Sequence, residues 1–202
     1  MQKITPLLYL FCTVLLTASC RDSRQAADKD TPDPAALNDK AMRIITQARD
    51  SSAVYEGLFY LDQAIAMDST YMAPYINKMN TLLRLNMSDK ALETLQKLNE
   101  RKAIPENVMF EGFIYDRELG DTARAREHYQ EAIRLYDEQF GQTGDSVLLL
   151  HKGLAILFTE GREAGISYYR QYGSTLAYHP LYGELKRQAE YFNKEQFLRE
   201  LW

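Results

Sequence analysis

The chain has 202 residues, of which 46% are apolar and 26% charged, and its formal net charge is −4. This length allows one domain of ordinary size with a substantial core, and the composition is that of a globular protein. Lys and Arg are mixed among Asp and Glu, and no basic face or arm stands out. We therefore expect no nucleic-acid partner.

The N-terminus, residues 1–19, has the features of a signal peptide. Lys3 supplies a positive charge, and the apolar run from Leu7 to Ala18 is shorter than the ~20 residues that a membrane-spanning helix needs. The sequence LTASC, which ends at Cys20, resembles the bacterial lipobox, although Thr17 stands where the lipobox usually has leucine. This resemblance implies cleavage before Cys20 and lipidation of that cysteine. A plain secretory signal is the alternative.

Lipidation of Cys20 would leave the mature protein without a free thiol, because Cys12 would leave with the signal. Disulfides, cysteine nucleophiles and cysteine-rich metal sites would then be excluded. Residues 20–34 comprise Cys20 and a polar segment with two prolines, which cannot bury enough surface to fold. We expect a lipid anchor, a flexible tether over residues 21–34 and a folded body over residues 35–202.

The body carries a repeated pattern of a small residue, a large residue four positions later and an apolar residue three positions after that. The four copies are Gly57, Leu61, Ala64; Ala91, Leu95, Leu98; Ala125, Tyr129, Ala132; and Gly165, Tyr169, Tyr172. The copies start 34, 34 and 40 residues apart. This period predicts a stack of antiparallel helix pairs, in which the small residue lets two helices approach closely and the large one fills the space beyond. Such stacks are more often binding proteins than enzymes.

Residues 119–138, LGDTARAREHYQEAIRLYDE, resemble the second half of a tetratricopeptide repeat. Gly112-x₂-Tyr115 and Gly153-x₂-Ile156 resemble the Gly-x₂-Tyr step of this family, and Tyr75 stands at the position of its tryptophan. The resemblance implies an all-α fold, a right-handed α-solenoid of about four helix-turn-helix repeats with a C-terminal helical cap. The implied repeats are 38–71, 72–105, 106–140 and 144–177, and the cap is 180–202.

The chain departs from the family pattern at several positions. Ser69, Ala103 and Asp137 stand where the family closes each repeat with proline, and Lys78 and Met79 replace Leu-Gly. These departures leave the helix boundaries open, especially in the fourth repeat. A generic α-helical bundle is the alternative fold.

The C-terminal third predicts a buried helix and its cover. The segment from Val147 to Phe158 is apolar on nearly every side, so it must be buried all round. Apolar residues at helical spacing follow at Leu181, Leu185, Ala189 and Phe192, and then at Phe197, Leu198, Leu201 and Trp202. Asn193 and Gln196 predict a capping box that starts the last helix. We expect these C-terminal helices to cover the apolar one.

No set of residues with catalytic spacing stands out. We expect His128 on a solvated face, His151 in the core or a groove, and His179 in a turn before the cap. None has the spacing of a metal site, and no phosphate-binding loop or nucleophile elbow is visible. We therefore expect no enzymatic activity, no metal and no cofactor.

The candidate binding site follows from the family resemblance, since partners of tetratricopeptide domains usually lie along the concave face lined by the first helices. The residues that would face inward are Met42, Thr46, Ala73, Ile76, Asn80, Leu83, Arg84, Asn107, Phe110, Ile114 and Arg117. This mixed strip suits an extended peptide or a helix with an acidic group. It differs from the family's carboxylate clamp, because Ile76 stands where that clamp has a lysine. Alternatively, these residues only support the stack.

Together these features favour a membrane-anchored scaffold or assembly lipoprotein of the bacterial cell envelope that binds a protein or peptide. Arg21 after the cysteine favours the outer membrane, with the domain facing the periplasm. The alternative is a periplasmic inhibitor or immunity-type protein that acts through its convex face or through an acidic patch in the cap between Glu184 and Glu200. An envelope hydrolase ranks last.

Overall fold

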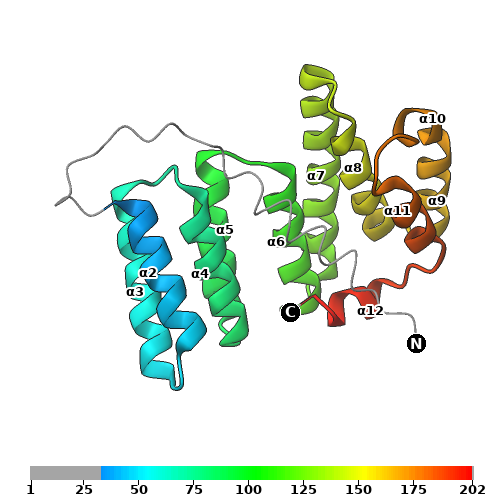
Figure 1. The fold of residues 1–202 in the computed structure, drawn as a ribbon. Coiled ribbons are helices and arrows are strands. Elements are labelled where there is room, and N and C mark those ends of the chain that lie inside the picture. The colour runs from blue at the N-terminus through cyan, green and yellow to red at the C-terminus, as the bar shows by residue number, and fades with distance from the viewer. Residues whose placement is uncertain (1–32, 202) are drawn as a thin grey trace. The chain divides into compact units, whose positions relative to one another are not determined.

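The computed structural model describes residues 33–201, and within this range the chain folds into eleven helices without a strand (Figure 1). The expected all-α class is therefore confirmed. The predicted signal peptide, Cys20, most of the tether and Trp202 lie outside the described residues. No helix within residues 33–201 combines the length and apolar character needed to cross a bilayer.

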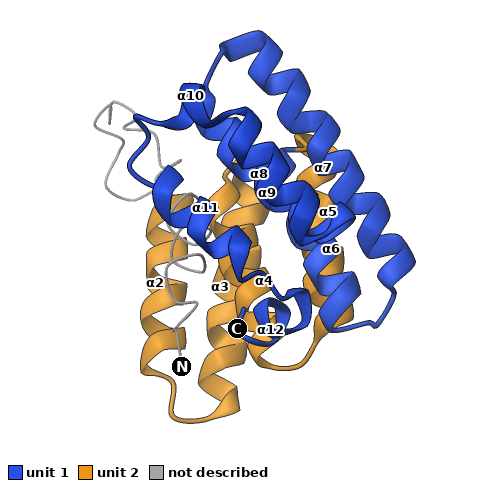
Figure 2. Ribbon diagram, turned by 90° about the vertical axis from the view of Figure 1, so that its right-hand side faces the viewer, with its two compact units in different colours: residues 1–20, 104–202 blue, residues 21–103 orange. Residues whose placement is uncertain are grey.

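The helices fall into two compact units, each described by itself (Figure 2). The described part of unit 2 is residues 33–103 and that of unit 1 is residues 104–201. Unit 2 contains α2 (Pro34–Gln47), α3 (Ser51–Met67), α4 (Met72–Arg84) and α5 (Ser88–Arg101). Each of its helices packs on the next along the chain, and α2 also contacts α4.

Unit 1 begins with two helix pairs and ends with shorter helices. Its elements are α6 (Pro105–Arg117), α7 (Thr122–Thr143), α8 (Ser146–Glu160), α9 (Arg162–Gln171), α10 (Gly173–Leu176), α11 (Tyr182–Glu190) and α12 (Lys194–Arg199). The helices from α6 to α9 pack in chain order, α11 packs on α8 and α9, and α12 packs on α6.

Side-chain caps explain where several helices begin. The Asp50, Asp121 and Asp145 carboxylates accept hydrogen bonds from backbone N–H groups in the first turns of α3, α7 and α8. Asp33 caps α2 in the same way, accepting from Ala35 N at 3.2 Å, and Pro34 occupies the first turn. The helix therefore includes Pro34, the last residue of the predicted tether.

The repeated pattern lies at the contacts between paired helices, as predicted. Eleven of its twelve residues are buried, and Tyr172 is half-buried. A Cβ atom on Gly57 would lie 3.2 Å from the Ala41 carbonyl oxygen and closer still to the Ile45 side chain. The glycine is therefore what allows α2 and α3 to approach so closely.

Two successive helix pairs of unit 1 share a second contact, between a glycine of the first helix and a tyrosine of the second. Gly112 in α6 lies against the ring of Tyr129 in α7, and Gly153 in α8 lies against the ring of Tyr169 in α9. Both tyrosines are fully buried. Their hydroxyls donate to Asp116 Oδ2 at 3.1 Å and to the Leu150 carbonyl at 2.9 Å, which fixes each ring over its glycine.

We predict that Gly153→Ala lowers the free energy of unfolding by about 1–3 kcal/mol, the usual cost of overpacking a core. The new methyl group would lie 2.7 Å from the Tyr169 hydroxyl oxygen, and the ring cannot move away without losing its bond to Leu150. Gly141→Ala is the control, because a Cβ at this helical glycine meets nothing within 4 Å. The control should stabilise by up to about 1 kcal/mol. Urea unfolding of the purified chain measures both, and equal effects would contradict the close contact.

The C-terminal segment covers α8, as predicted. The Phe158 ring at the end of α8 lies 5.1 Å from the rings of both Phe192 and Phe197, measured between centroids. In α11, Leu185 and Ala189 are buried, whereas Leu181 is 36% exposed, contrary to the prediction. It precedes the first turn of α11 and is outside the packed face.

The predicted capping box of α12 is half right. The Asn193 side chain accepts from the Gln196 N–H at 2.9 Å, which confirms the N-cap. The Gln196 side chain does not reach back to the cap, because its amide donates to Glu200 Oε1 at 3.1 Å. A separate contact holds α12 to α6: the Lys194 ammonium lies 2.5 Å from Asp116 Oδ2.

Candidate functional site

The seven residues of the predicted strip in unit 2 lie on the neighbouring helices α2 and α4. The Asn77 amide of α4 donates to Asn38 Oδ1 of α2 at 2.8 Å, so the two first helices are side by side. Six of the seven predicted residues here have some solvent access. Thr46, Asn80 and Arg84 are exposed, and Met42, Ala73 and Ile76 are partly so, but Leu83 is buried. Thr46 on α2 and Asn80 and Arg84 on α4 are therefore the exposed polar members of the strip in this unit.

The four predicted residues in unit 1 are less accessible. Asn107, Phe110 and Ile114 are buried, and only Arg117 is partly exposed, with its guanidinium 3.2 Å from Glu118. Every residue of α6 from Val108 to Tyr115 is buried, so this helix has little open face. Like Leu83, the three buried residues belong to the core here, not to an open surface. Their role in partner binding stays a prediction.

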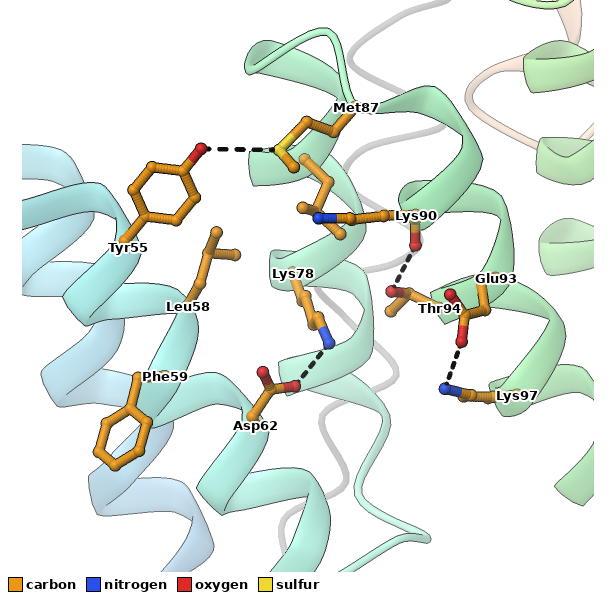
Figure 3. A pocket seen from close by; sticks show the side chains of 11 residues that line it. Tyr55, Leu58, Phe59, Asp62, Lys78, Met87, Lys90, Glu93, Thr94 and Lys97 are labelled. Atoms are coloured by element: carbon orange, nitrogen blue, oxygen red, sulfur yellow. Dashed lines mark hydrogen bonds and ion pairs between the residues drawn. The ribbon is translucent and has the colours of Figure 1, made fainter. Parts of the chain in front are cut away.

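A groove of about 310 Å³ lies on α3, α4 and α5 of unit 2 (Figure 3). Its lining residues are Tyr55, Leu58, Phe59, Asp62, Lys78, Leu82, Met87, Lys90, Glu93, Thr94 and Lys97. Leu58 and Leu82 are buried, whereas Tyr55 and Phe59, one helical turn apart, are 53% and 56% exposed. Figure 3 shows Tyr55 facing Met87 across the groove, with its hydroxyl 4.0 Å from the sulfur.

The charges of the groove are unevenly paired. Lys78 reaches from α4 to Asp62 on α3 at 2.5 Å, and Lys97 contacts Glu93 within α5 at 2.7 Å. The hydrogen bond from Lys97 and its positive charge lower the pKa of Glu93. No carboxylate of the described residues forms an ion pair with Lys90. The groove therefore carries one ammonium group in excess.

This groove was not among the surfaces predicted from the sequence, although the sequence contains one sign of it. Lys78 replaces an expected leucine of the repeat pattern and lies on α4 two residues before Asn80 of the predicted strip. Two residues correspond to about 200° around a helix axis, so Lys78 and Asn80 point to opposite sides of α4. A lysine at a position where the repeat pattern expects leucine indicated that this side of α4 is also accessible to solvent.

The histidines lie in structural contacts. His151 is buried, with Nδ1 3.2 Å from Glu106 Oε1, which confirms its predicted place in the core. His179 lies in the turn before α11, as predicted, and accepts from the Leu181 N–H at 3.3 Å. His128 is not on a solvated face, contrary to expectation. It is half-buried and stacks on Tyr115 with centroids 5.1 Å apart, and burial lowers its pKa.

Within residues 33–201, no three His, Cys, Asp or Glu side chains are grouped so that they could hold a metal ion. No protein-family model matches the chain, and no curated protein is significantly similar to it.

Proposed function

We propose that this protein is a membrane-anchored, protein-binding scaffold or assembly lipoprotein of the bacterial cell envelope. The observation that carries the proposal is the strip on α2 and α4, where Thr46, Asn80 and Arg84 are exposed beside partly exposed apolar residues. Hydrogen-bonding groups next to apolar surface are what an extended peptide or an amphipathic helix needs. A positively charged Arg84 favours an acidic group in the bound segment.

The proposed architecture is a right-handed solenoid of tetratricopeptide-like repeats. It is supported by the 34-residue intervals of the small-residue pattern and by the burial of that pattern between paired helices. The glycine–tyrosine contacts at Gly112 and Gly153 give further support, because the same contact recurs at corresponding positions of two helix pairs.

The anchor is proposed on the sequence alone. The apolar run that ends at Ala18, the lipobox-like residues before Cys20 and the polar segment after it are the parts of a lipoprotein N-terminus. We propose attachment to the outer membrane with the helical domain facing the periplasm.

We predict that Asn80→Ala, Arg84→Ala and Arg117→Ala each weaken capture of the partner in intact cells by several-fold and leave the helical circular dichroism unchanged. Asn80 and Arg84 are exposed and Arg117 is partly exposed, so we expect these changes to cost binding more than folding. Lys102→Ala, which removes an exposed basic side chain just after α5, is the control and should capture normally.

Unchanged capture by all three strip variants would contradict the proposed contact surface. If capture then depended on exposed carboxylates of the cap, such as Glu190, Glu195 and Glu200, the result would favour an inhibitor or immunity-type protein acting through that region.

A further inference from the structure

The groove on α3, α4 and α5 combines exposed aromatic surface with an unpaired positive charge, on the side of α4 that faces away from the strip. We propose that this groove is a second binding site, which takes an acidic peptide segment of a partner protein and holds one large apolar or aromatic side chain of that segment against Tyr55 and Phe59. This inference does not depend on the strip.

The apolar part of the groove would hold the large side chain of the peptide. Tyr55 and Phe59 lie on one face of α3 and leave 53% and 56% of their surface in water. Leu58 and Leu82, which also line the groove, are buried and add apolar surface to it. Single exposed aromatic residues are common on protein surfaces. Two exposed aromatic residues one helical turn apart, both lining a groove, are more typical of a protein interface. The flexible Met87 side chain can adapt to the shape of an inserted residue.

The charged side chains of the groove favour a negatively charged ligand. Asp62 and Glu93 are already matched by Lys78 and Lys97, which leaves the ammonium of Lys90 for a carboxylate of the ligand. Figure 3 shows Lys90 extending from α5 across the groove towards α3. The excess positive charge is local, because the whole chain carries a formal charge of −4.

The size and chemistry of the groove favour a peptide over other ligands. Its volume of about 310 Å³ is at the lower end of the ~300–1,000 Å³ of small-molecule sites, and it is open to solvent. It can thus hold a side chain or two of a longer segment, not an enclosed molecule. Nucleic acid fits poorly, because a groove with one ammonium group in excess does not match the closely spaced charges of a phosphate backbone.

The test uses a displayed library of random 12-residue peptides and the full-length chain, purified in mild detergent. Peptides enriched on the native chain are sequenced, and the Kd of the most enriched peptide is then measured by fluorescence anisotropy. We expect enrichment of peptides that combine Asp or Glu with a large apolar or aromatic residue. Phe59→Ala should weaken the binding of such a peptide about tenfold or more.

Charge and position are tested by matched variants. Lys90→Glu should weaken binding about tenfold at low salt and less at high salt, because salt screens an exposed pair. Lys102→Glu is the same change at an exposed lysine of the same unit that does not line the groove, and it should have little effect. Asn80→Ala and Arg84→Ala, which test the strip, should leave this Kd unchanged.

The proposal is overturned if no peptide is enriched, if the enriched peptides lack acidic residues, or if Phe59→Ala and Lys90→Glu bind as tightly as the native chain. Loss of binding in Asn80→Ala or Arg84→Ala alone would place the peptide on the strip, and it would therefore support the proposed function while excluding the groove. Binding lost only in the groove variants would establish the second site whatever the strip does.

Discussion

Phe158→Ala is expected to lower the free energy of unfolding of unit 1 by about 3–5 kcal/mol, the usual cost of truncating a buried aromatic residue. The Phe158 ring lies at the centre of an aromatic cluster, with the centroids of Phe113, Tyr129 and Phe197 4.9–5.1 Å away. These rings come from α6, α7 and α12, so the truncation opens a cavity where α8, the α6–α7 pair and the C-terminal segment meet. Because domains are stable by only about 5–15 kcal/mol, much of that stability would be lost.

Phe59→Ala is the matched control for this loss. It removes the same ring from a side chain that is 56% exposed, against 5% for Phe158. Phe59→Ala should change the free energy of unfolding by no more than about 0.5 kcal/mol, as for most surface substitutions. Urea unfolding followed by circular dichroism measures both variants. A Phe158→Ala protein as stable as Phe59→Ala would show that the C-terminal segment does not pack on α8.

Asp116→Ala is expected to destabilise unit 1 by about 3 kcal/mol, since it removes a buried carboxylate that pairs with the partly exposed Lys194 and accepts a hydrogen bond from the buried Tyr129. The Asp116 side chain is only 4% exposed and binds two groups at once, the Lys194 ammonium at 2.5 Å and the Tyr129 hydroxyl at 3.1 Å. Its removal would leave the buried Tyr129 hydroxyl without its acceptor and would release α12 from α6. Burial and the Asp116 carboxylate together raise the pKa of Tyr129, so this hydroxyl remains a donor.

Asp62→Ala tests whether burial is the cause. Asp62 makes a lysine ion pair of the same 2.5 Å length with Lys78, but its side chain is 54% exposed. Exposed pairs contribute only about 0–1 kcal/mol, so this variant should unfold close to the native midpoint. Equal losses in the two variants, measured by urea unfolding, would contradict the proposed role of Asp116 as a buried link between α6, α7 and α12.

The helical core could be predicted because its signals are periodic along the chain. The buried positions of α3, α5, α7 and α9 follow from small and large residues four apart, and α8 follows from its continuous apolar run. Both features depend on helix geometry, which the local sequence determines. The cover over α8 followed from the same reasoning, because a helix that is apolar all round requires neighbours.

The surfaces were harder to predict because they depend on which helix covers which. Asn107 and Ile114 were predicted in the strip from their positions on the helix, but neighbouring side chains bury both. His128 was expected on a solvated face, but Tyr115, from another helix, stacks on it. The groove at Phe59 and Lys90 depends on two helices that lie more than twenty residues apart in sequence. No local pattern brings these residues together.

The most direct test of the central proposal is crosslinking in intact cells, followed by mass spectrometry of the captured partners, with the native chain compared with Cys20→Ser. A lipid-anchored binding protein should sediment with membranes and capture a small, reproducible set of envelope proteins, and Cys20→Ser should abolish the membrane association and sharply reduce that capture. If Cys20→Ser stays with the membranes and captures the same proteins in the same amounts, the lipid anchor is wrong. If the native chain captures no partner above background, the binding function is wrong.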